Sequence, residues 1–322
     1  MGNKISVIIP CYNGWKYMDR CLHSLENQTC PPFEIIVVDD CSSDNSYKQL
    51  TEYSKTSSLN FVILKNETNV GPGASRGKAI NVAKGDYVAF CDGDDWFELN
   101  FVEEMTLAIE KESPDVIIFD SYNAYDDRSL RANTLDGIEN SKKNILANMR
   151  MSLCRLVAKR EIVQKVSFPP LYFGEDAAVV PQIIAEANRF TLINKPFYHY
   201  YFREGSASQK PSPKACAQLA LAFETVKASL SEEHRTECEY IGIKCVCYSA
   251  ILSGFKSGTP TKQIKEILRT FEEEFPNWTE NPYRNNLCKI KNIFLFLISK
   301  KWFLPAKVMT YMHGLYVKFR KK

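Results

Sequence analysis

The segment Ile5–Asn13, with the sequence ISVIIPCYN, decides the fold class of this chain. Its apolar run is typical of a buried strand, and the polar residues Tyr12 and Asn13 follow that run. Similar apolar runs recur through the first 120 residues, and segments with helical spacing separate them. This alternation predicts an α/β fold with a mostly parallel sheet flanked by helices. The expected strands are Ile5–Pro10, Glu34–Asp39, Phe61–Lys65, Tyr87–Cys91 and Val116–Asp120, and the expected helices are Tyr17–Gln28, Asp44–Ser54, Gly73–Ala83 and Phe101–Lys111.

The rest of the chain has a weaker pattern. Ser121–Lys143 is polar and predicts an irregular loop. The sequence KPSP at residues 210–213 breaks the pattern, and the apolar spacing beyond it is helical. We therefore expect a first domain at residues 1–210, with halves that meet near residue 120, and a helical C-terminal region at residues 211–322. Within the first domain we also expect extended segments at Leu153–Ala158, Thr191–Ile193 and Phe197–Phe202 and a helix at Glu175–Ala187.

The composition is that of an ordinary globular protein, with 25% charged and 45% hydrophobic residues. The eleven cysteines are scattered, and no two have Cys-x-x-Cys spacing. They therefore predict buried thiols in a reducing compartment rather than a zinc or redox site. The N-terminus runs directly into the first expected strand, which is too brief for the apolar part of a signal peptide. We expect a cytoplasmic protein.

Polar side chains follow the first two expected strands. Tyr12 follows the first strand, and Asp39 and Asp40 end the second. Ligands of parallel sheets bind beyond the carboxyl ends of the strands, so these residues are candidates for a nucleobase site. In that site Tyr12 would stack on the ring, and Asp39 or Asp40 would accept a hydrogen bond from its imide N–H. The alternative is a turn built from Asp and Ser. We expect Ser42 or Ser43 to cap the helix that follows.

A glycine-rich segment, Asn69–Lys78, follows the third expected strand. Its glycines, Gly71 among them, would let the backbone approach a phosphate, and the start of the next helix favours anions. Arg76 could make a forked contact with such a group. The segment is neither a dinucleotide fingerprint, because Arg76 replaces the third glycine, nor a P-loop, because Pro72 replaces the first. The alternative is a glycine-rich turn.

The most specific signal follows the fourth expected strand, where Asp92, Asp94 and Asp95 lie within four residues. Carboxylates this close repel one another unless a cation is present, and their hard oxygen atoms suit Mg²⁺ or Mn²⁺. Such an ion can bridge a diphosphate and neutralise the charge of a departing nucleotide. The alternative, a solvated acidic loop, fits less well after a strand as apolar as Tyr87–Cys91.

Two later segments add charged candidates. Glu175 and Asp176 open an expected helix, where carboxylates also stabilise the helix dipole. Arg203 follows the aromatic run Phe197–Phe202. It could clamp a phosphate, or it could be a surface arginine on an aromatic strand.

Taken together and in order, these segments resemble glycosyltransferase family 2, the inverting nucleotide-sugar transferases with the GT-A fold. The similarity runs from about residue 5 to residue 208. It rests on five motifs at family-like intervals, namely VIIPCYN at 7–13, VVDDCSSD at 37–44, NVGPGASR at 69–76, DGDD at 92–95 and ED at 175–176. The resemblance implies that residues 1–120 bind the nucleotide-sugar and residues 121–210 the acceptor.

The resemblance also implies roles for the matching residues. Asp176 would be the general base that takes the proton of the acceptor hydroxyl as its oxygen attacks the anomeric carbon. Asp94, together with Asp92, would bind Mn²⁺ or Mg²⁺ on the donor diphosphate. The residues expected to bind the nucleotide-sugar are Pro10, Tyr12, Asp39, Asp40, Gly71, Arg76, Asp92, Glu175 and Arg203.

The chain departs from the family pattern at residues 75–77, where Ala-Arg-Asn is common and Ser-Arg-Gly stands here. The Gln-x-x-Arg-Trp motif of the processive synthases is absent from the sequence, so we expect transfer of a single sugar. The resemblance favours a UDP-sugar donor, with GDP or dTDP as alternatives, and an acceptor in cell-surface or lipid-linked glycan synthesis. A nucleotidyltransferase and a non-catalytic nucleotide-sugar-binding protein remain the alternative functions.

The last part of the chain carries an uneven charge. Residues 281–322 contain ten Lys or Arg and no Asp or Glu, whereas the rest has 31 basic and 38 acidic residues, a net charge of −7. A basic amphipathic helix of this kind predicts peripheral contact with the inner face of an anionic membrane, and a helix packed on the first domain is the alternative. No nucleic-acid partner is expected. Two apolar helical faces are predicted, one from Ile290, Ile293, Phe294, Leu297 and Ile298 and one from Val308, Met309, Met312, Tyr316 and Phe319.

Overall fold

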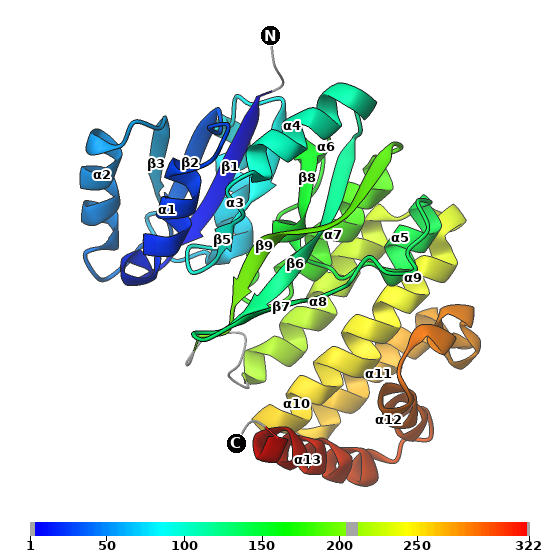
Figure 1. Cartoon of the computed structure of the whole chain (residues 1–322). Coiled ribbons are helices and arrows are strands. Elements are labelled where there is room, and N and C mark those ends of the chain that lie inside the picture. The colour runs from blue at the N-terminus through cyan, green and yellow to red at the C-terminus, as the bar shows by residue number, and fades with distance from the viewer. Residues whose placement is uncertain (1–3, 204–211, 321–322) are drawn as a thin grey trace. The chain divides into compact units, whose positions relative to one another are not determined.

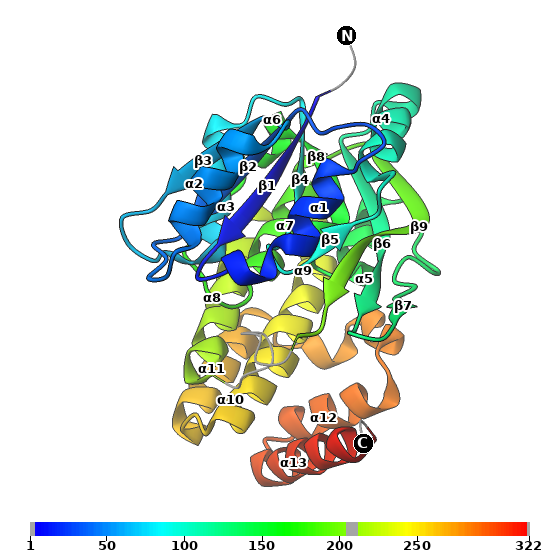
Figure 2. The ribbon, with the colours of Figure 1, turned by 60° about the vertical axis from the view of Figure 1, so that its left-hand side comes forward.

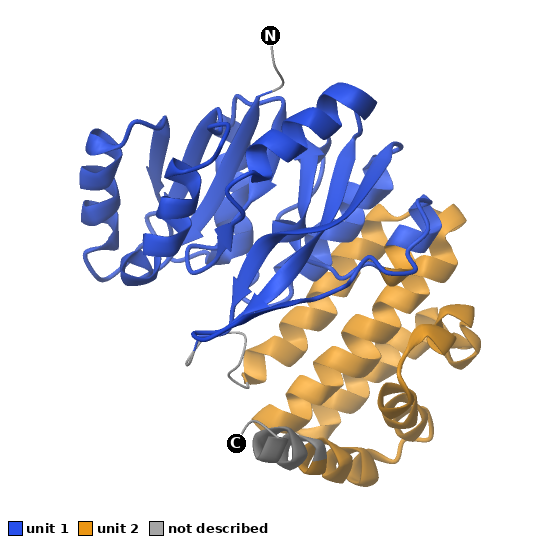
Figure 3. Cartoon of the chain, in the orientation of Figure 1, with its two compact units in different colours: residues 1–145, 149–206 blue, residues 146–148, 207–322 orange. Residues whose placement is uncertain are grey.

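The computed structural model describes residues 4–203 and 212–320, with side chains up to residue 312. The chain divides into two compact units (Figure 3). Unit 1 comprises residues 1–145 and 149–206, and unit 2 comprises residues 146–148 and 207–322. The domain boundary expected at residue 210 lies outside the described residues.

Four parallel strands form the first half of the sheet in unit 1 (Figure 1). Their order is β3-β2-β1-β4, and their bounds agree to within one residue with the first four predicted strands. Most side chains of β1, β2 and β4 are buried on both faces of the sheet. These strands are therefore continuous apolar runs in the sequence, without alternation of apolar and polar residues. The strands are β1 (Ile5–Cys11), β2 (Glu34–Asp39), β3 (Phe61–Lys65) and β4 (Tyr87–Phe90).

The second half of the sheet is mixed rather than parallel. The order continues β4-β8-β6-β9-β5, in which only β6 and β9 are parallel neighbours, and β7 pairs with β6 at the side. The region expected to be an irregular loop therefore begins with strand structure, because β6 runs on to Ala124 beside the end of β9. These strands are β5 (Trp96–Phe97), β6 (Val116–Ala124), β7 (Ser129–Arg131), β8 (Leu156–Lys159) and β9 (Phe190–Tyr201).

Helices cover both faces of the parallel strands (Figure 2). Right-handed crossovers place α1 (Asp19–Glu26) and α2 (Ser46–Thr56) on one face. The connection from β3 to β4 runs back across β2 and β1, which places α3 (Gly71–Val82) on the other face. The strand order therefore reverses between β1 and β4, and ligands of such sheets bind at the carboxyl ends beside this reversal. The other helices of unit 1 are η1 (Trp15–Tyr17), α4 (Phe101–Glu112), α5 (Lys142–Asn148, whose last residues belong to unit 2), η2 (Leu153–Arg155), α6 (Arg160–Val163) and α7 (Glu175–Glu186).

The cap predicted for the second helix is wrong. Helix α2 begins at Ser46 after Asn45, which makes no side-chain cap hydrogen bond. Ser42 and Ser43 are instead engaged by Asn13 in the loop after β1. The prediction was wrong because these serines form hydrogen bonds with the loop after β1, which is distant in sequence, rather than with the start of α2.

Unit 2 is helical, as predicted. Gly242 lies directly against the rings of Phe223 and Phe271, so its missing side chain allows the helices that carry them to pack closely. The described part of the chain contains no helix with the length and hydrophobicity that crossing a membrane requires. Its longer elements are α8 (Pro213–Ser229), α9 (Arg235–Gly242), the π-helix η5 (Ile243–Ala250), α10 (Ile251–Ser257), α11 (Thr261–Glu274), α12 (Lys289–Ser299) and α13 (Phe303–Arg320).

Candidate active site

The loops that follow β1 and β2 are tied together at the carboxyl edge of the sheet. Asn13 has a φ of 48°, and its N–H donates to Ser42 Oγ at 2.9 Å. Its side-chain Oδ1 accepts a hydrogen bond from the N–H of Ser43 at 2.9 Å. The neighbouring Tyr12 is 53% exposed, whereas Pro10 before it is half-buried in β1. An exposed ring on a hydrogen-bonded loop is available to stack on a planar ligand.

Asp40 holds the loop that leads into α3. Its carboxylate is 3% exposed and accepts hydrogen bonds from Asn66 Nδ2 at 2.8 Å and from the N–H groups of Val70 and Gly71 at 2.9 and 2.8 Å. Three donors from the chain itself explain why a carboxylate is required at this buried position.

Asp39 is also buried, but one of its oxygen atoms has no partner. Its Oδ2 accepts a hydrogen bond from the N–H of Ser42 at 3.1 Å, whereas its Oδ1 makes no hydrogen bond. A buried acceptor without a donor is costly, so an N–H group of a ligand at this edge would be stabilised there. Of the two candidates for the imide N–H of a base, Asp39 has the free acceptor, and Asp40 already has three donors.

The glycines at the start of α3 make room for the chain's own backbone. Gly71 has a φ of 88°, and a Cβ there would lie 2.8 Å from the carbonyl oxygen of Leu171. A Cβ at Gly73 would lie 2.7 Å from the carbonyl oxygen of Pro169. The segment that precedes α7 therefore packs directly on the N-terminal turn of α3. This close approach is enough to explain why glycines are needed here, even if no phosphate binds. The predicted contact of Gly71 with a phosphate stays a prediction.

Two of the three carboxylates after β4 are paired with arginines. Asp92 Oδ1 accepts a hydrogen bond from Arg76 at 2.5 Å, and Asp94 Oδ2 accepts one from Arg203 Nε at 2.5 Å. Burial raises the pKa of Asp94, and repulsion from Asp92 raises it further, while Arg203 opposes both effects. The guanidinium of Arg203 also lies 4.2 Å from the ring centroid of Tyr17, in the helical turn that follows the Tyr12 loop. Arg203 thus connects the β4 edge with the β1 edge.

The third carboxylate, Asp95, is turned into the protein. It is 1% exposed, accepts a hydrogen bond from the hydroxyl of Tyr198, and accepts another from the N–H of Tyr201 at 2.7 Å. Burial raises its pKa well above the ordinary value, and Asp92 and Asp94 add to this effect. Asp95 therefore fixes β9 to the loop after β4. Within the acidic motif, Asp92 and Asp94 pair with arginines at the candidate site, whereas Asp95 has a structural role.

Arg76 lies beneath the site rather than facing solvent. Its side chain is 2% exposed and lies between Asp92 and Glu175, whose Oε1 is 3.3 Å from the guanidinium. Burial opposes the positive charge, but Asp92, Asp176 and Glu175 together raise the pKa well above its ordinary value. We predicted that Arg76 would hold the diphosphate, yet its observed contacts are with the carboxylates that surround it.

Asp176 has the properties of a base that acts near neutral pH. It follows Glu175 in the first turn of α7, and its Oδ1 is buried without a hydrogen-bond partner. Burial raises its pKa from 3.8 to about 7, repulsion from Glu175 adds to the increase, and Arg76 opposes it. A carboxylate that exchanges its proton near pH 7 suits general base catalysis. Through Arg76, this group and the Asp92 edge form one connected charge cluster.

Tyr17 and Tyr198 are structural parts of this edge that the sequence does not identify, and Asp95, part of the predicted acidic motif, contacts β9 instead of facing solvent. Tyr198 also accepts a hydrogen bond from the N–H of Asp92 at 3.2 Å. The aromatic run before Arg203 contained Tyr198, but nothing in the run indicated that its hydroxyl would face two aspartates. Long-range pairing of β9 with β5 creates that contact.

A divalent ion is compatible with this arrangement of carboxylates. Among the described residues no three His, Cys, Asp or Glu side chains converge on one point as a metal site. Asp92 and Asp94 nevertheless lie at one strand end, and burial together with repulsion from Asp92 raises the pKa of Asp94. A cation near both carboxylates would favour their charged forms. Two carboxylates leave most of the coordination shell of Mg²⁺ for phosphate oxygens and water, which is how this ion is usually bound.

Comparisons with known proteins agree with this geometry. Residues 6–158 match the model of the family described as Glycosyl transferase family 2. Poly(ribitol-phosphate) beta-N-acetylglucosaminyltransferase TarS of Staphylococcus aureus is 29% identical over 248 residues, which cover 73% of this chain and 42% of that protein. Glycosyltransferase GlyA of Streptococcus pneumoniae is 27% identical over 222 residues, which cover 64% of this chain and 32% of that protein. This chain therefore matches less than half the length of either relative.

Solved structures show the same fold. The crystal structure of S. aureus TarS 1–349 in complex with UDP superposes with a TM-score of 0.71 at 22% identity, and covers 97% of this chain and 92% of that one. The complex of the same fragment with UDP-GlcNAc has a TM-score of 0.65. The α/β fold with a helical C-terminal region is thereby confirmed. The family match and the relatives agree that residues 6–158 are similar to glycosyltransferase family 2.

Proposed function

We propose that this protein transfers a single sugar from a UDP-sugar to an acceptor hydroxyl with inversion at the anomeric carbon. The observation that carries the proposal is the connected charge cluster in which Arg76 links Asp92 to Glu175, beside the candidate base Asp176. A donor diphosphate at the Asp92 edge would place its sugar near that base. The UDP and UDP-GlcNAc complexes of the S. aureus relative support UDP as the nucleotide.

The transfer step follows from the state of Asp176. Its carboxylate takes the proton of the acceptor hydroxyl while the oxygen attacks the anomeric carbon, and the bond between that carbon and the diphosphate oxygen breaks. The diphosphate leaves with the electron pair, and Asp176 keeps the proton until solvent removes it. Because the attack comes from the side opposite the leaving group, a single displacement inverts the configuration and needs no covalent sugar–enzyme intermediate.

The nucleotide would be recognised by groups on the first two strands. Tyr12 offers an exposed ring for stacking, and Asp39 Oδ1 is a buried acceptor that lacks a donor. The imide N–H of uracil would donate to this acceptor, and a base without a donor at that position would bind less tightly. Arg203, on its aromatic support, would turn from Asp94 toward the diphosphate, where a guanidinium can make forked contacts.

We further propose that Asp94 and Asp92 hold Mn²⁺ or Mg²⁺ together with the donor diphosphate. Such an ion supplies a positive charge that stabilises the leaving nucleoside diphosphate. Asp94 is the stronger candidate as a ligand, because Arg203 can leave it when phosphate is present, whereas Asp92 is bound to the buried Arg76.

The acceptor is proposed to be a glycan or polyol of a cell-surface polymer. Relatives of this chain carry names of transferases that act on poly(ribitol-phosphate), a chain of hydroxyl-bearing units. The acceptor would approach from the acceptor-binding half predicted at residues 121–210, which contains Asp176.

A donor screen tests the proposed reaction. Purified protein is incubated with UDP-, GDP- and dTDP-sugars, with Mn²⁺, Mg²⁺ or EDTA, and release of the nucleoside diphosphate is measured. We expect slow hydrolysis of at least one UDP-sugar that requires a divalent ion and is lost in Asp176→Asn. A protein that binds UDP tightly but turns over no donor, with or without added acceptor polymers, would be a binding protein instead.

We also propose that helices α12 and α13 contact an anionic membrane surface. The residues of the predicted apolar face of α12 lie in a helix, as expected, but they differ in burial. Phe294 and Ile298 are buried, whereas Ile290 and Ile293 are exposed. Of the expected α13 face, Val308 and Met312 are exposed, and the side chains of Tyr316 and Phe319 lie outside the described residues. The exposed large apolar residues of this surface are Ile290, Ile293, Phe296, Trp302, Leu304, Val308, Tyr311 and Met312.

Charge supports a membrane rather than a protein core as the partner of this surface. Residues 281–322 carry ten basic and no acidic side chains, and exposed apolar groups among lysines are typical of helices that lie in a membrane interface. Flotation with phosphatidylserine-containing vesicles tests this directly. Self-association of the protein without vesicle binding would instead identify the surface as an interface between copies.

A further inference from the structure

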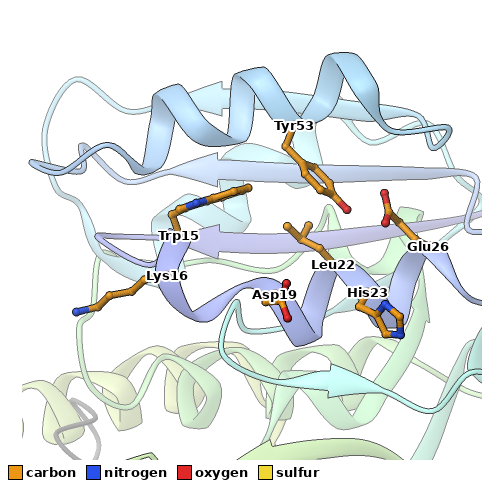
Figure 4. A pocket seen from close by; sticks show the side chains of 7 residues that line it. All are labelled: Trp15, Lys16, Asp19, Leu22, His23, Glu26 and Tyr53. Carbon is orange, nitrogen blue, oxygen red and sulfur yellow. The ribbon is translucent and has the colours of Figure 1, made fainter.

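A separate cavity of unit 1 lies between α1 and α2, and nothing in the proposed transfer reaction uses it. Its volume is about 320 Å³, at the small end of the range of about 300–1,000 Å³ typical of ligand pockets. Seven residues from three consecutive helical elements line it (Figure 4): Trp15, Lys16, Asp19, Leu22, His23, Glu26 and Tyr53.

Two aromatic rings form one wall of this cavity. Trp15 and Tyr53 meet edge to face with ring centroids 5.9 Å apart, and Tyr53 makes a second edge contact with Phe61 at 5.7 Å. The backbone N–H of Trp15 donates a hydrogen bond to Ser46 Oγ at 3.0 Å, which fixes the helical turn that carries the indole ring. Leu22, which is almost fully buried, also lines the cavity (Figure 4). The rings are thus held in place before any ligand binds.

Hydrogen-bonding groups of α1 also line the cavity. Asp19 and His23 are exposed on α1, one helical turn apart, and Glu26 follows. Glu26 Oε1 accepts a hydrogen bond from Ser57 Oγ at 2.9 Å, so its carboxylate is positioned by the end of α2. Burial of the phenol raises the pKa of Tyr53, and its hydrogen bond to Glu26 raises it further, so the hydroxyl stays a neutral donor.

We propose that this cavity binds one pyranose ring of a glycan. A pyranose combines an apolar face of C–H groups, which packs on an aromatic ring, with a rim of hydroxyls that donate to carboxylates. The cavity supplies both features, namely the rings of Trp15 and Tyr53 and the carboxylates of Asp19 and Glu26. The inference rests on the proposed function in one respect, namely that a glycan is the natural ligand of this protein.

The cavity is connected to the candidate active site through a short helical turn. Lys16 lines the cavity, and the next residue, Tyr17, lies against Arg203, which pairs with Asp94. A glycan unit bound between α1 and α2 would therefore hold a polymeric acceptor near the donor edge without entering the transfer site. Polymer acceptors would gain more from this subsite than short ones.

Fluorine NMR of 5-fluorotryptophan-labelled protein tests the proposal. The chain has four tryptophans, so the spectrum has few signals, and Trp15→Phe assigns the relevant one. The probes are the methyl glycosides of glucose, galactose and N-acetylglucosamine, each titrated without nucleotide. We expect at least one glycoside to shift the Trp15 signal saturably, while the signal of Trp278, which is almost fully buried elsewhere, stays fixed. The double variant Asp19→Asn, Glu26→Gln should weaken that binding about tenfold.

Three outcomes would overturn the proposal. The first is that no glycoside shifts Trp15 saturably, and the second is that the exposed Trp302 shifts equally, which would indicate a bulk effect. The third is that tetramethylammonium shifts Trp15 whereas glycosides do not, because two rings with two carboxylates would then form a cation site. The readout needs neither donor nor metal ion, so a failed transfer reaction would leave it intact, and its own failure would leave the transfer proposal standing.

Discussion

The carboxyl edge of the sheet in unit 1 and the last two helices of unit 2 depart from ordinary burial in opposite directions. At the sheet edge, charged groups are buried: Arg76 is 2% exposed between Asp92 and Glu175. In α12 and α13, apolar groups are exposed: Leu304 and Met312 keep 73% and 66% of their surface in solvent. Buried charges and exposed clusters of apolar side chains are the two informative exceptions to the usual distribution of residues.

The two regions are incomplete in different ways. The sheet edge contains buried polar atoms without partners, such as Asp39 Oδ1 and Asp176 Oδ1, which a small polar ligand would satisfy. The exposed surface of α12 and α13 lacks an apolar environment, which only a large partner such as a membrane can supply. Each of the following predictions alters one of these regions and leaves the other unchanged.

The largest effect is expected from Asp176→Asn at the sheet edge. Loss of the base should lower kcat by about 10²- to 10⁴-fold while the affinity for UDP is retained. Steady-state kinetics and calorimetry measure the two quantities. Glu186→Gln, on the same helix but exposed, is the matched control and should keep full activity. Equal losses of UDP affinity and of kcat would remove Asp176 from the role of base.

The pH dependence sharpens the same prediction. Asp176 must be ionised to act, so kcat/KM of the wild type should rise with pH and level off above about 7. Because the folded state raises this pKa from 3.8, it binds the proton more tightly than the unfolded chain, and this group's contribution to stability falls as pH rises from about 4 to 7. Asp176→Asn should therefore become more stable relative to wild type across that interval in urea unfolding. A pH-independent difference would argue against the raised pKa.

Replacement of the buried arginine should mainly affect stability. Arg76→Met leaves Asp92 and Glu175 without their partner and should lower the free energy of unfolding by about 3 kcal/mol. Arg128→Met, which breaks an exposed pair with Asp127, is the control and should change it by less than about 1 kcal/mol. If Arg76 instead served only the diphosphate, UDP affinity would fall without a change in urea unfolding.

Removal of two exposed lysines tests the helical surface of unit 2. Lys289→Gln together with Lys300→Gln should weaken partitioning onto phosphatidylserine vesicles by about thirtyfold, since each lysine near an anionic surface contributes about 1 kcal/mol. Lys48→Gln, at an exposed position of unit 1, is the control. Donor hydrolysis should be unchanged in all of these variants. Partitioning that is insensitive to both lysines and salt would contradict the electrostatic part of the proposal.

The smallest effect is expected at the base site. Asp39→Asn replaces an acceptor without a partner and should weaken UDP binding about tenfold with little loss of stability. Asp40→Asn should instead destabilise the loop that begins α3, because its carboxylate already accepts three hydrogen bonds from the chain. Calorimetric titration and thermal unfolding of both variants separate these roles. The opposite result, with Asp40 critical for UDP and Asp39 neutral, would assign the base to Asp40.

The sequence predicted the parallel half of the sheet well because its strands are continuously apolar and follow one another along the chain. It did not predict the pairing of β5, β8 and β9, which depends on contacts between distant segments. Contacts between distant segments also limited how much of the candidate site the sequence could predict. The acidic motif was visible in the sequence, but whether Asp95 or Asp94 faces the ligand depends on Tyr198 in β9. Likewise, the sequence predicted that Arg76 would contact a phosphate. It could not show that Arg76 is buried against Asp92 and Glu175, because that burial depends on the packing of α3 against α7.

We propose that the carboxylates after β4 bind a nucleoside diphosphate together with a divalent ion. Calorimetric titration of UDP into the wild type and into Asp94→Asn, each with Mn²⁺ and with EDTA, measures this binding. We predict that EDTA weakens UDP binding by the wild type at least tenfold, and that Asp94→Asn binds weakly whether or not Mn²⁺ is present. Equal affinities in all four titrations would contradict the claim.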